Sequence, residues 1–339
     1  MNEKTLHDTA LAMVAQGRGI LAADESTSTI GKRFDGIQVE NTEENRRAYR
    51  DMLFSAAGIE QYTSGVIFYE ETLFQKAADG TPFPQMLAKK GIIPGIKVDK
   101  GTKALPGSPT ETITEGLDGL RERLTKYKEA GARFAKWRAV ITIGNGIPTD
   151  YCIHTNAHAL ARYAALCQEQ DIVPIVEPEV LMDADNTIEV CEDVTRRTLH
   201  AVFNELHAQR ILLDGIILKP NMVIAGKKCA KQADRKAVAA ATLRTLKRFV
   251  PSTVPGIAFL SGGQSDEDAT AHLDEMNKLG GGPWVLSFSY GRALQAAALK
   301  AWSGRKENLA AGQRAYMHRA KMNGLAATGK WEQKLEKAA

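Results

Sequence analysis

The sequence is poor in cysteine, and its few cysteines are far apart. The four of them, Cys152, Cys167, Cys191 and Cys229, form no C-x-x-C pair. Such spacing in a long chain is typical of reduced thiols in a reducing compartment. No run of 18 uninterrupted apolar residues occurs, and residues 1–15 lack the apolar centre and cleavage site of a signal peptide. We therefore expect a cytoplasmic protein that does not act in a membrane.

A block of basic charge is also absent. The chain holds 44 Lys and Arg against 40 Asp and Glu, a net charge of +4, and the charges are mixed along its length. Basic residues come only as short pairs, such as Lys227-Lys228, which do not make the continuous patch that follows a phosphate backbone. Nucleic acid is not an expected partner.

The motifs of metal and nucleotide sites are missing as well. Seven histidines occur, but no H-E-x-x-H, and none falls at the end of a predicted strand. Gly31-Lys32 is followed by Arg33 rather than by Ser or Thr, so no P-loop is present. The sequence predicts no metal and no cofactor.

What is present is a repeated unit, in which a short apolar run is followed by a longer segment of helical periodicity. Such alternation predicts parallel strands with helical crossovers, and eight units in about 270 residues are typical of a (β/α)8 TIM barrel. An open α/β sheet would usually carry G-x-G-x-x-G after its first strand, where this chain has AADESTST. We expect one domain over residues 1–339, with the barrel at about 19–300 and a further helix and polar tail at about 304–339. The predicted strands are 19–23, 65–69, 92–98, 134–141, 172–176, 215–218, 256–260 and 284–288.

Polar residues stand at the ends of most of these strands. In a TIM barrel the C-terminal strand ends build the active site, and side chains two apart on a strand share a face. A single charged residue at such a place is most often a solvated rim residue, but charges recurring at many strand ends point to a site. The residues concerned are Asp24, Lys97, Asp99, Lys136, Arg138, Glu177, Glu179, Lys219, Ser261-Gly262-Gly263 and Ser289-Tyr290-Gly291-Arg292.

Lys219 ends the most apolar of these strands, in the stretch ILLDGIILKPNM. Partial burial near other cations would favour its neutral amine, which can attack a carbonyl and form a Schiff base. The alternative is a lysine whose stem packs while its head reaches water, and composition leaves both open.

Schiff-base chemistry needs a proton shuttle, which Glu177 or Glu179 could supply, and Asp24 could take a proton from a substrate hydroxyl. The two glutamates could equally form structural salt bridges to Lys136 or Arg138. Loops after strands seven and eight of TIM barrels often bind phosphate. Here Gly262, Gly263 and Arg292 would provide backbone N–H groups and a charged clamp, although two glycines alone often mean only a turn.

Together these stretches resemble the class I, Schiff-base-forming fructose-1,6-bisphosphate aldolases along nearly the whole chain. The matching segments are GILAADEST (19–27), NTEENRR (41–47), GIKVDKG (95–101), AKWR (135–138), VPIVEPE (173–179), LKPNM (218–222), FLSGGQS (259–265) and FSYGRALQ (288–295).

The resemblance implies reversible cleavage of fructose 1,6-bisphosphate to dihydroxyacetone phosphate and glyceraldehyde 3-phosphate, in glycolysis or gluconeogenesis. It implies Lys219 as the Schiff-base lysine, Glu177 as the general acid and base with Lys136 and Glu179 beside it, and Asp24 at the C4 hydroxyl. It further implies a homotetramer and a sugar phosphate as the only small-molecule partner. The phosphate contacts it implies are Ser261, Gly262, Gly263, Ser289, Gly291 and Arg292 for one group, and Ser26, Thr29, Arg33, Arg46, Lys97 and Arg138 for the other.

The chain departs from the animal and plant members of this family at its end. It closes with WEQKLEKAA, where those enzymes end in a tyrosine that assists proton transfer at C3, and its last tyrosine is Tyr316. We expect another proton donor or water to serve instead. The alternatives are a Schiff-base aldolase or transaldolase for another sugar phosphate, and a binding protein that has lost its chemistry. The intact set of Asp24, Lys136, Glu177 and Lys219 argues against the second.

Overall fold

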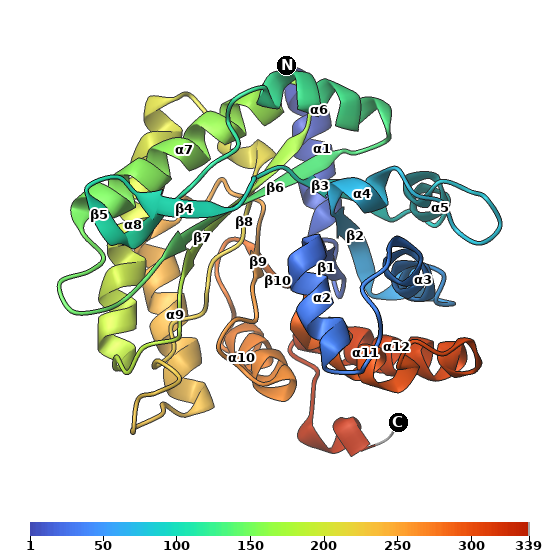
Figure 1. The fold of residues 1–339 in the computed structure, drawn as a ribbon. Coiled ribbons are helices and arrows are strands. Elements are labelled where there is room, and N and C mark those ends of the chain that lie inside the picture. Colours follow the sequence, from blue (N-terminus) through green and yellow to red (C-terminus); the bar gives the residue numbers. More distant parts are fainter. Residues whose placement is uncertain (338–339) are drawn as a thin grey trace.

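Eight parallel strands close into a barrel at the centre of the molecule (Figure 1), in a computed structural model that describes residues 1–337. The expected (β/α)8 barrel is therefore confirmed. The strands follow one another around the barrel in the order β1-β10-β9-β8-β7-β6-β3-β2. Their bounds are β1 (Gly19–Ala23), β2 (Thr63–Phe68), β3 (Ile93–Lys97), β6 (Phe134–Ile141), β7 (Val173–Val180), β8 (Ile217–Leu218), β9 (Gly256–Phe259) and β10 (Val285–Tyr290).

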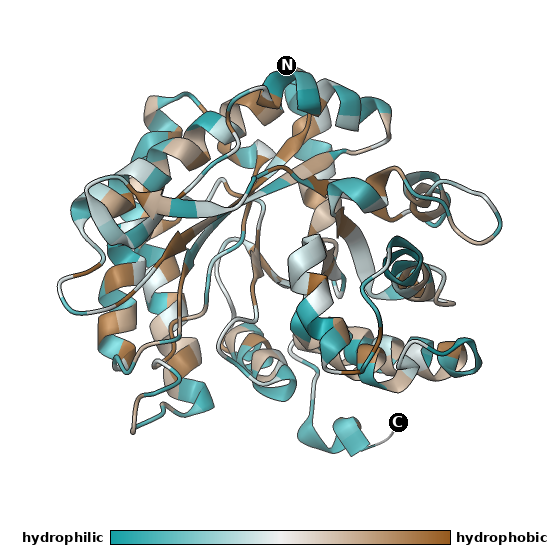
Figure 2. Ribbon diagram, in the orientation of Figure 1, coloured by the Kyte–Doolittle hydropathy of each residue, from teal (hydrophilic) through white to brown (hydrophobic). Residues whose placement is uncertain are grey.

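Helices surround the barrel, with their apolar faces toward the strands (Figure 2). Several begin at a residue whose side chain satisfies a free backbone N–H of the first turn, such as Thr42, which accepts from the N–H of Asn45 at 3.1 Å. The helices are α1 (Glu3–Met13), α2 (Thr27–Asp35), α3 (Glu43–Phe54), α4 (Glu70–Leu73), α5 (Phe83–Lys89), α6 (Leu120–Glu129), α7 (Asp150–Glu169), α8 (Ile188–Ala208), α9 (Arg235–Phe249), α10 (Asp266–Lys278), α11 (Arg292–Trp302) and α12 (Leu309–Ala326).

The N-terminal end of the barrel is closed by apolar side chains. Leu6, Met13 and Val14, from α1 and the residue after it, pack in one buried cluster with strand residues such as Phe134. Room for the Phe134 ring comes from Gly95 on the neighbouring strand, where a Cβ atom would lie 2.2 Å from the ring carbons. This end is filled with apolar side chains, and the polar strand residues gather at the opposite end.

Two strands, β7 and β8, differ most from their expected bounds. β7 continues through Glu177-Pro178-Glu179 to Val180, because β6 is equally long and pairs with it from Phe134↔Val173 to Ile141↔Val180. β8 is shorter than expected, since Leu213–Gly215 form a 3-10 turn and only Ile217–Leu218 pair with both neighbours. β1 and β6 have the predicted bounds, and β2, β3, β9 and β10 are found with ends shifted by one or two residues.

A small antiparallel hairpin was not expected. β4 (Thr102–Leu105) and β5 (Ser108–Thr114) lie between β3 and α6, joined at Pro106-Gly107. Gly107 has φ +76°, a left-handed conformation that suits glycine in such a turn. The hairpin extends from the barrel mouth (Figure 1).

The segment after the barrel folds back along it. α12 packs on α11, and Glu336 in the tail accepts hydrogen bonds from Arg319 Nη1 at 2.5 Å and Trp331 Nε1 at 2.9 Å. Ala338 and Ala339, the last residues of the expected polar tail, lie outside the described residues. Tyr316 is fully buried in α12, with its hydroxyl 3.1 Å from Thr63 Oγ1. Over residues 1–337, no helix combines the length and hydropathy needed to cross a bilayer.

Candidate active site

A cavity of about 640 Å³ opens at the C-terminal ends of the strands. Its size suits a small ligand, and its walls come from loops and strand ends far apart in the sequence. Most residues that the sequence singled out line it: Asp24, Ser26, Thr29, Arg33, Lys97, Lys136, Arg138, Glu177, Glu179, Lys219, Ser261, Gly262, Ser289 and Gly291.

A chain of alternating charges lies on the cavity floor. Lys219 Nζ lies 3.1 Å from Glu177 Oε1, and Lys136 Nζ lies 3.6 Å from Glu177 Oε2. Lys136 Nζ also lies 2.6 Å from Asp24 Oδ2. The side chains of Lys219, Lys136 and Glu177 are each no more than 5% exposed, so the four groups interact with little screening by water.

Strand pairing explains why these groups meet. β6, β7 and β8 are neighbours in the barrel, with Arg138 paired to Glu177. Between Lys136 and Arg138, the Trp137 ring stacks on Tyr163 of α7 at 5.6 Å between ring centres. Because successive side chains alternate across a strand, this outward packing of Trp137 turns both cations into the cavity.

Asp24 and Lys136 stabilise each other's ionised forms. Burial opposes the carboxylate of Asp24, but Lys136, Lys219 and Lys97 outweigh it and lower the pKa of Asp24 to about 2. Burial likewise opposes the ammonium of Lys136, and the carboxylates of Asp24, Glu177 and Asp99 nevertheless raise the pKa of Lys136 above its ordinary value. Asp24 is therefore a carboxylate at neutral pH, and Lys136 remains a cation.

The two glutamates of β7 have different partners. Glu179 accepts a hydrogen bond from Arg138 Nε in a close ion pair, whereas Glu177 contacts both lysines. Over the described residues, Glu177 Oε2 is buried and has no hydrogen-bond partner. Glu177 therefore combines contacts to two lysines with a carboxylate oxygen that is available for proton transfer.

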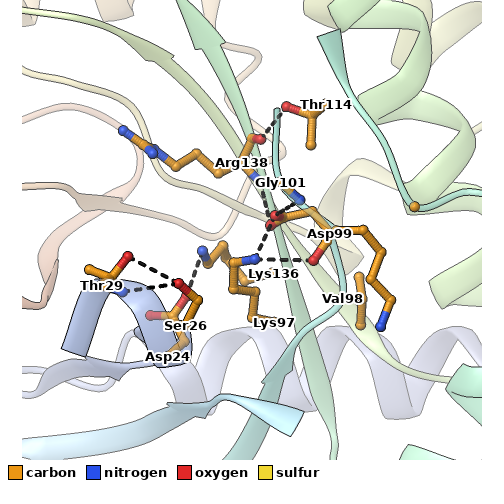
Figure 3. A network of polar contacts seen from close by, with 12 residues as sticks. Asp24, Ser26, Thr29, Lys97, Val98, Asp99, Gly101, Thr114, Lys136 and Arg138 are labelled. Carbon is orange, nitrogen blue, oxygen red and sulfur yellow. Dashed lines mark hydrogen bonds and ion pairs between the residues drawn. The ribbon is translucent and has the colours of Figure 1, made fainter. Parts of the chain in front are cut away.

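Hydroxyl groups and a lysine form the side of the cavity shown in Figure 3. Ser26 is the N-cap of α2, where its Oγ accepts from the N–H of Thr29 at 3.3 Å and lies 3.1 Å from Thr29 Oγ1. Across from them, Lys97 Nζ lies 2.7 Å from Asp99 Oδ1. A helix N-terminus with hydroxyls beside an ammonium group is suited to an anion.

Residues at the ends of β9 and β10 form another part of the wall. Ser261, Gly262, Ser289 and Gly291 all line the cavity. Ser289 is buried, and its Oγ has no hydrogen-bond partner over residues 1–337. A hydroxyl left this way is free to bind a ligand oxygen.

Three predicted residues do not line the cavity. Arg292 lies 2.6 Å from Asp266 and donates to the carbonyl of Gln264. Gly263 turns away with φ +80° and packs on Met182. Arg46 binds Glu71 on α4 at 2.6 Å. Both guanidinium groups are thus bound by neighbours in the fold, and the phosphate roles of all three residues remain predictions.

Other cavity residues were not assigned a role from the sequence. Asp99 was noted only as a charge at a strand end, and its spacing of two from Lys97 was the signal that could have linked them. Glu25 follows Asp24 directly and binds Arg33 and Gln295. The cavity is also lined by Tyr69 at the end of the predicted strand 65–69, by Glu70 of α4, and by Lys100 and Thr102 at the start of the hairpin, and the sequence assigned none of them a role.

Among residues 1–337, no group of three or more His, Cys, Asp or Glu side chains is placed to hold a metal ion. His154 and His158, which share a face of α7, both point toward Glu205 on α8 and are largely exposed.

Comparisons with known proteins agree with this geometry. Residues 5–339 match the family model described as fructose-bisphosphate aldolase class-I. A probable fructose-bisphosphate aldolase class 1 of Xanthomonas campestris is 59% identical over 98% of this chain and all of the relative, and fructose-bisphosphate aldolase 1 of Toxoplasma gondii is 57% identical over 97% and 91%. A Plasmodium falciparum fructose-bisphosphate aldolase, solved in complex with TRAP and a small-molecule inhibitor, superimposes with a TM-score of 0.96 at 52% identity, over 97% of this chain and 96% of that one. The chain therefore belongs to the class I fructose-bisphosphate aldolase family, whose lyase chemistry is metal-independent and proceeds through a Schiff base.

Proposed function

We propose that Lys219 is the amine that forms the Schiff base with the ketone carbon of fructose 1,6-bisphosphate. The observation that carries this proposal is the buried chain Lys219–Glu177–Lys136–Asp24 on the cavity floor. The neutral amine adds to the C2 carbonyl, and the carbinolamine then loses water, with Glu177 supplying the proton that leaves with the hydroxyl.

Carbon–carbon cleavage is assigned to Asp24. Its carboxylate takes the proton of the C4 hydroxyl, the C3–C4 bond breaks, and the electron pair moves to the iminium to give an enamine on Lys219. Glyceraldehyde 3-phosphate is the first product. The enamine then gains a proton at C3, and hydrolysis releases dihydroxyacetone phosphate. We assign the C3 proton to Glu177, whose Oε2 has no hydrogen-bond partner over residues 1–337, or to a water that it activates.

Two sides of the cavity would hold the two phosphates. Ser261, Gly262, Ser289 and Gly291 offer hydroxyls and backbone N–H groups to one, while Ser26, Thr29, Lys97 and neighbouring Arg33 and Arg138 serve the other. Arg292, Gly263 and Arg46 complete the proposed contacts, and each would have to leave its present partner to do so. With Lys97, Arg33 and Arg138 available to the second phosphate, the bisphosphate should be cleaved more efficiently than fructose 1-phosphate.

We further infer a cytoplasmic homotetramer in which residues 1–339 act as one domain, on the strength of the resemblance and of the reduced cysteines. Sedimentation at micromolar concentration tests the assembly, because a tetramer of 36.9 kDa chains is readily told from a dimer or monomer.

The decisive experiment traps the Schiff base. Protein incubated with dihydroxyacetone phosphate is reduced with borohydride, and the modified peptide is found by mass spectrometry. We expect the adduct on Lys219, none in K219M, and an adduct on Lys219 still in K136M, whose lysine is equally buried in the same cavity. An adduct on Lys136, or one that survives in K219M, would contradict the assignment.

A further inference from the structure

Asp99 follows β3 and is buried at the cavity wall, where it receives donors from three parts of the chain (Figure 3). Its Oδ1 accepts from Lys97 Nζ at 2.7 Å and from the backbone N–H of Gly101 at 3.1 Å. Its Oδ2 accepts from the backbone N–H of Arg138 at 3.3 Å. One carboxylate therefore joins the end of β3, the start of the hairpin and the middle of β6.

The contact with Arg138 continues the barrel beyond the end of β3. The pairing of β3 with β6 ends at Lys97↔Lys136, and the N–H of Val98 still donates to the carbonyl of Lys136 at 3.0 Å. Farther along β6, the N–H of Arg138 donates to the side chain of Asp99, and its carbonyl accepts from Thr114 Oγ1 at 2.7 Å. The backbone N–H and carbonyl of Arg138 are thus both held by side chains, which fixes the position of the Cα atom from which its side chain extends.

The contact with Lys97 leaves that lysine able to bind a ligand. Lys97 Nζ donates to Asp99 Oδ1 and also to the backbone carbonyl of Asp99 at 3.0 Å. An ammonium group has three donors, so one N–H remains for the cavity that Lys97 lines. If the lysine moves toward a ligand, Oδ1 keeps the Gly101 N–H and Oδ2 keeps that of Arg138. The carboxylate is therefore never left without a partner.

We propose that Asp99 is a positioning residue that holds Lys97 and Arg138 for the phosphate bound beside Ser26 and Thr29. This phosphate is taken to be the one that fructose 1-phosphate lacks, so Asp99 sets the preference for a bisphosphate over a monophosphate sugar. The inference rests on the proposed function, because it takes Lys97 and Arg138 as contacts of that phosphate. Asp99 itself touches no reacting atom. It acts by keeping two flexible cations in the geometry of the bound state before the substrate arrives.

The test compares D99N, K97M and the double variant on fructose 1,6-bisphosphate and on fructose 1-phosphate. We expect D99N to raise KM for the bisphosphate by about tenfold or more, the size of a lost charged hydrogen bond. Its kcat/KM for the monophosphate should stay within about twofold of wild type. In the K97M background, D99N should raise KM for the bisphosphate less, because part of the effect of Asp99 depends on its contact with Lys97.

A matched control is T114V, which removes the other side-chain contact to the backbone of Arg138 and leaves Lys97 untouched. We expect it to shift the preference less than D99N does. Equal losses on both substrates, or an unchanged KM for the bisphosphate in D99N, would overturn the inference, because the first means general damage and the second means no positioning.

Borohydride trapping with dihydroxyacetone phosphate separates this inference from the proposed function. A variant that traps as fast as wild type has a folded, working site, so an unchanged preference there refutes only the role of Asp99. Failure of wild type to trap on Lys219 would refute the proposed function itself. If D99N fails to fold, D99E can replace it, because it keeps the charge but displaces it by one methylene. The same rise in KM for the bisphosphate is expected for D99E. Equal losses on both substrates, or an unchanged KM for the bisphosphate, would again overturn the inference.

Discussion

Asp24 shows how burial and charge act against each other at a single residue. Burial alone would raise the pKa of its carboxyl, yet the cations around it, with Lys136 the foremost, bring that pKa down to about 2. A group whose pKa is lowered stays ionised at every pH above that value. Asp24 is thus a carboxylate throughout the pH range in which the enzyme can be assayed, and it can act as a base but not as an acid.

We predict that D24N separates the two halves of the reaction. Cleavage of fructose 1,6-bisphosphate should slow by about 100-fold to 10,000-fold, the usual contribution of a general base. Borohydride trapping of dihydroxyacetone phosphate on Lys219 should persist, because the ketone carbon reacts without Asp24. Single-turnover cleavage and trapping are measured on the same preparation.

The pH dependence of kcat/KM in the wild type provides a second test of the ionisation of Asp24. The acid limb of kcat/KM between pH 4 and 7 should not come from this carboxyl, since its pKa of about 2 lies below that range. If D24N lost trapping and cleavage equally, Asp24 would have a structural role in the site and would not act as the general base for cleavage.

The β4–β5 hairpin is the element that the repeat pattern did not predict. Its Pro106-Gly107 turn was visible in the sequence, but the two short strands lie outside the barrel and carry little apolar periodicity. Glu111 holds the hairpin to α7: its carboxylate accepts from the N–H of Thr149 at 2.8 Å, and from Thr149 Oγ1 and Ser108 Oγ at 2.7 Å each. A buried acid at this helix N-terminus also benefits from the helix dipole.

Removing that acid should loosen the hairpin. Burial opposes the charge of Glu111, but the hydrogen bonds from Thr149 and Ser108 lower its pKa below the usual value. E111A leaves those donors without an acceptor, and we expect a loss of about 2–4 kcal/mol in the free energy of unfolding, measured by urea denaturation. The exposed Glu122 on α6 serves as the control, with E122A expected within about 0.5 kcal/mol of wild type. Similar values for the two variants would mean that the Glu111 contacts contribute little.

The stability of the whole molecule should depend on pH through His272. This residue of α10 is buried, and its Nδ1 lies 2.6 Å from Gln264 Oε1. Burial lowers the pKa of His272 to about 4, with Arg235 adding to the effect and Asp268 opposing it. In the unfolded chain the same ring titrates near pH 6.5. As the pH falls below 6.5, the unfolded state therefore takes up the proton first and folding weakens.

We predict that wild type loses about 2 kcal/mol of this contribution between pH 7 and pH 5, and that H272Q, which has no titrating ring, loses correspondingly less. Denaturation at the two pH values measures the difference. The exposed His207 provides a control, and H207Q should follow wild type. If H272Q and wild type weaken equally on acidification, the pH dependence arises elsewhere.

The sequence by itself determined the barrel and the positions of its polar strand ends. Strand and helix periodicity is local, so the repeat could be read along the chain, and a lysine such as Lys219 at the end of an apolar run was visible without any partner. The difference of face between Trp137 and its neighbours Lys136 and Arg138 also follows from alternation alone.

Only the tertiary structure decided which charges meet. Glu177 and Glu179 are equivalent in the sequence, yet the first contacts two lysines and the second an arginine. The pairing of β8 ends at Leu218↔Val176, which places Lys219 beside Glu177, whereas Glu179 lies farther along β7. Arg292 offered a phosphate clamp but lies beside Asp266, close to it only in the folded chain. Ion pairs join residues that are distant in sequence, so they depend on barrel closure and strand register, which periodicity does not encode.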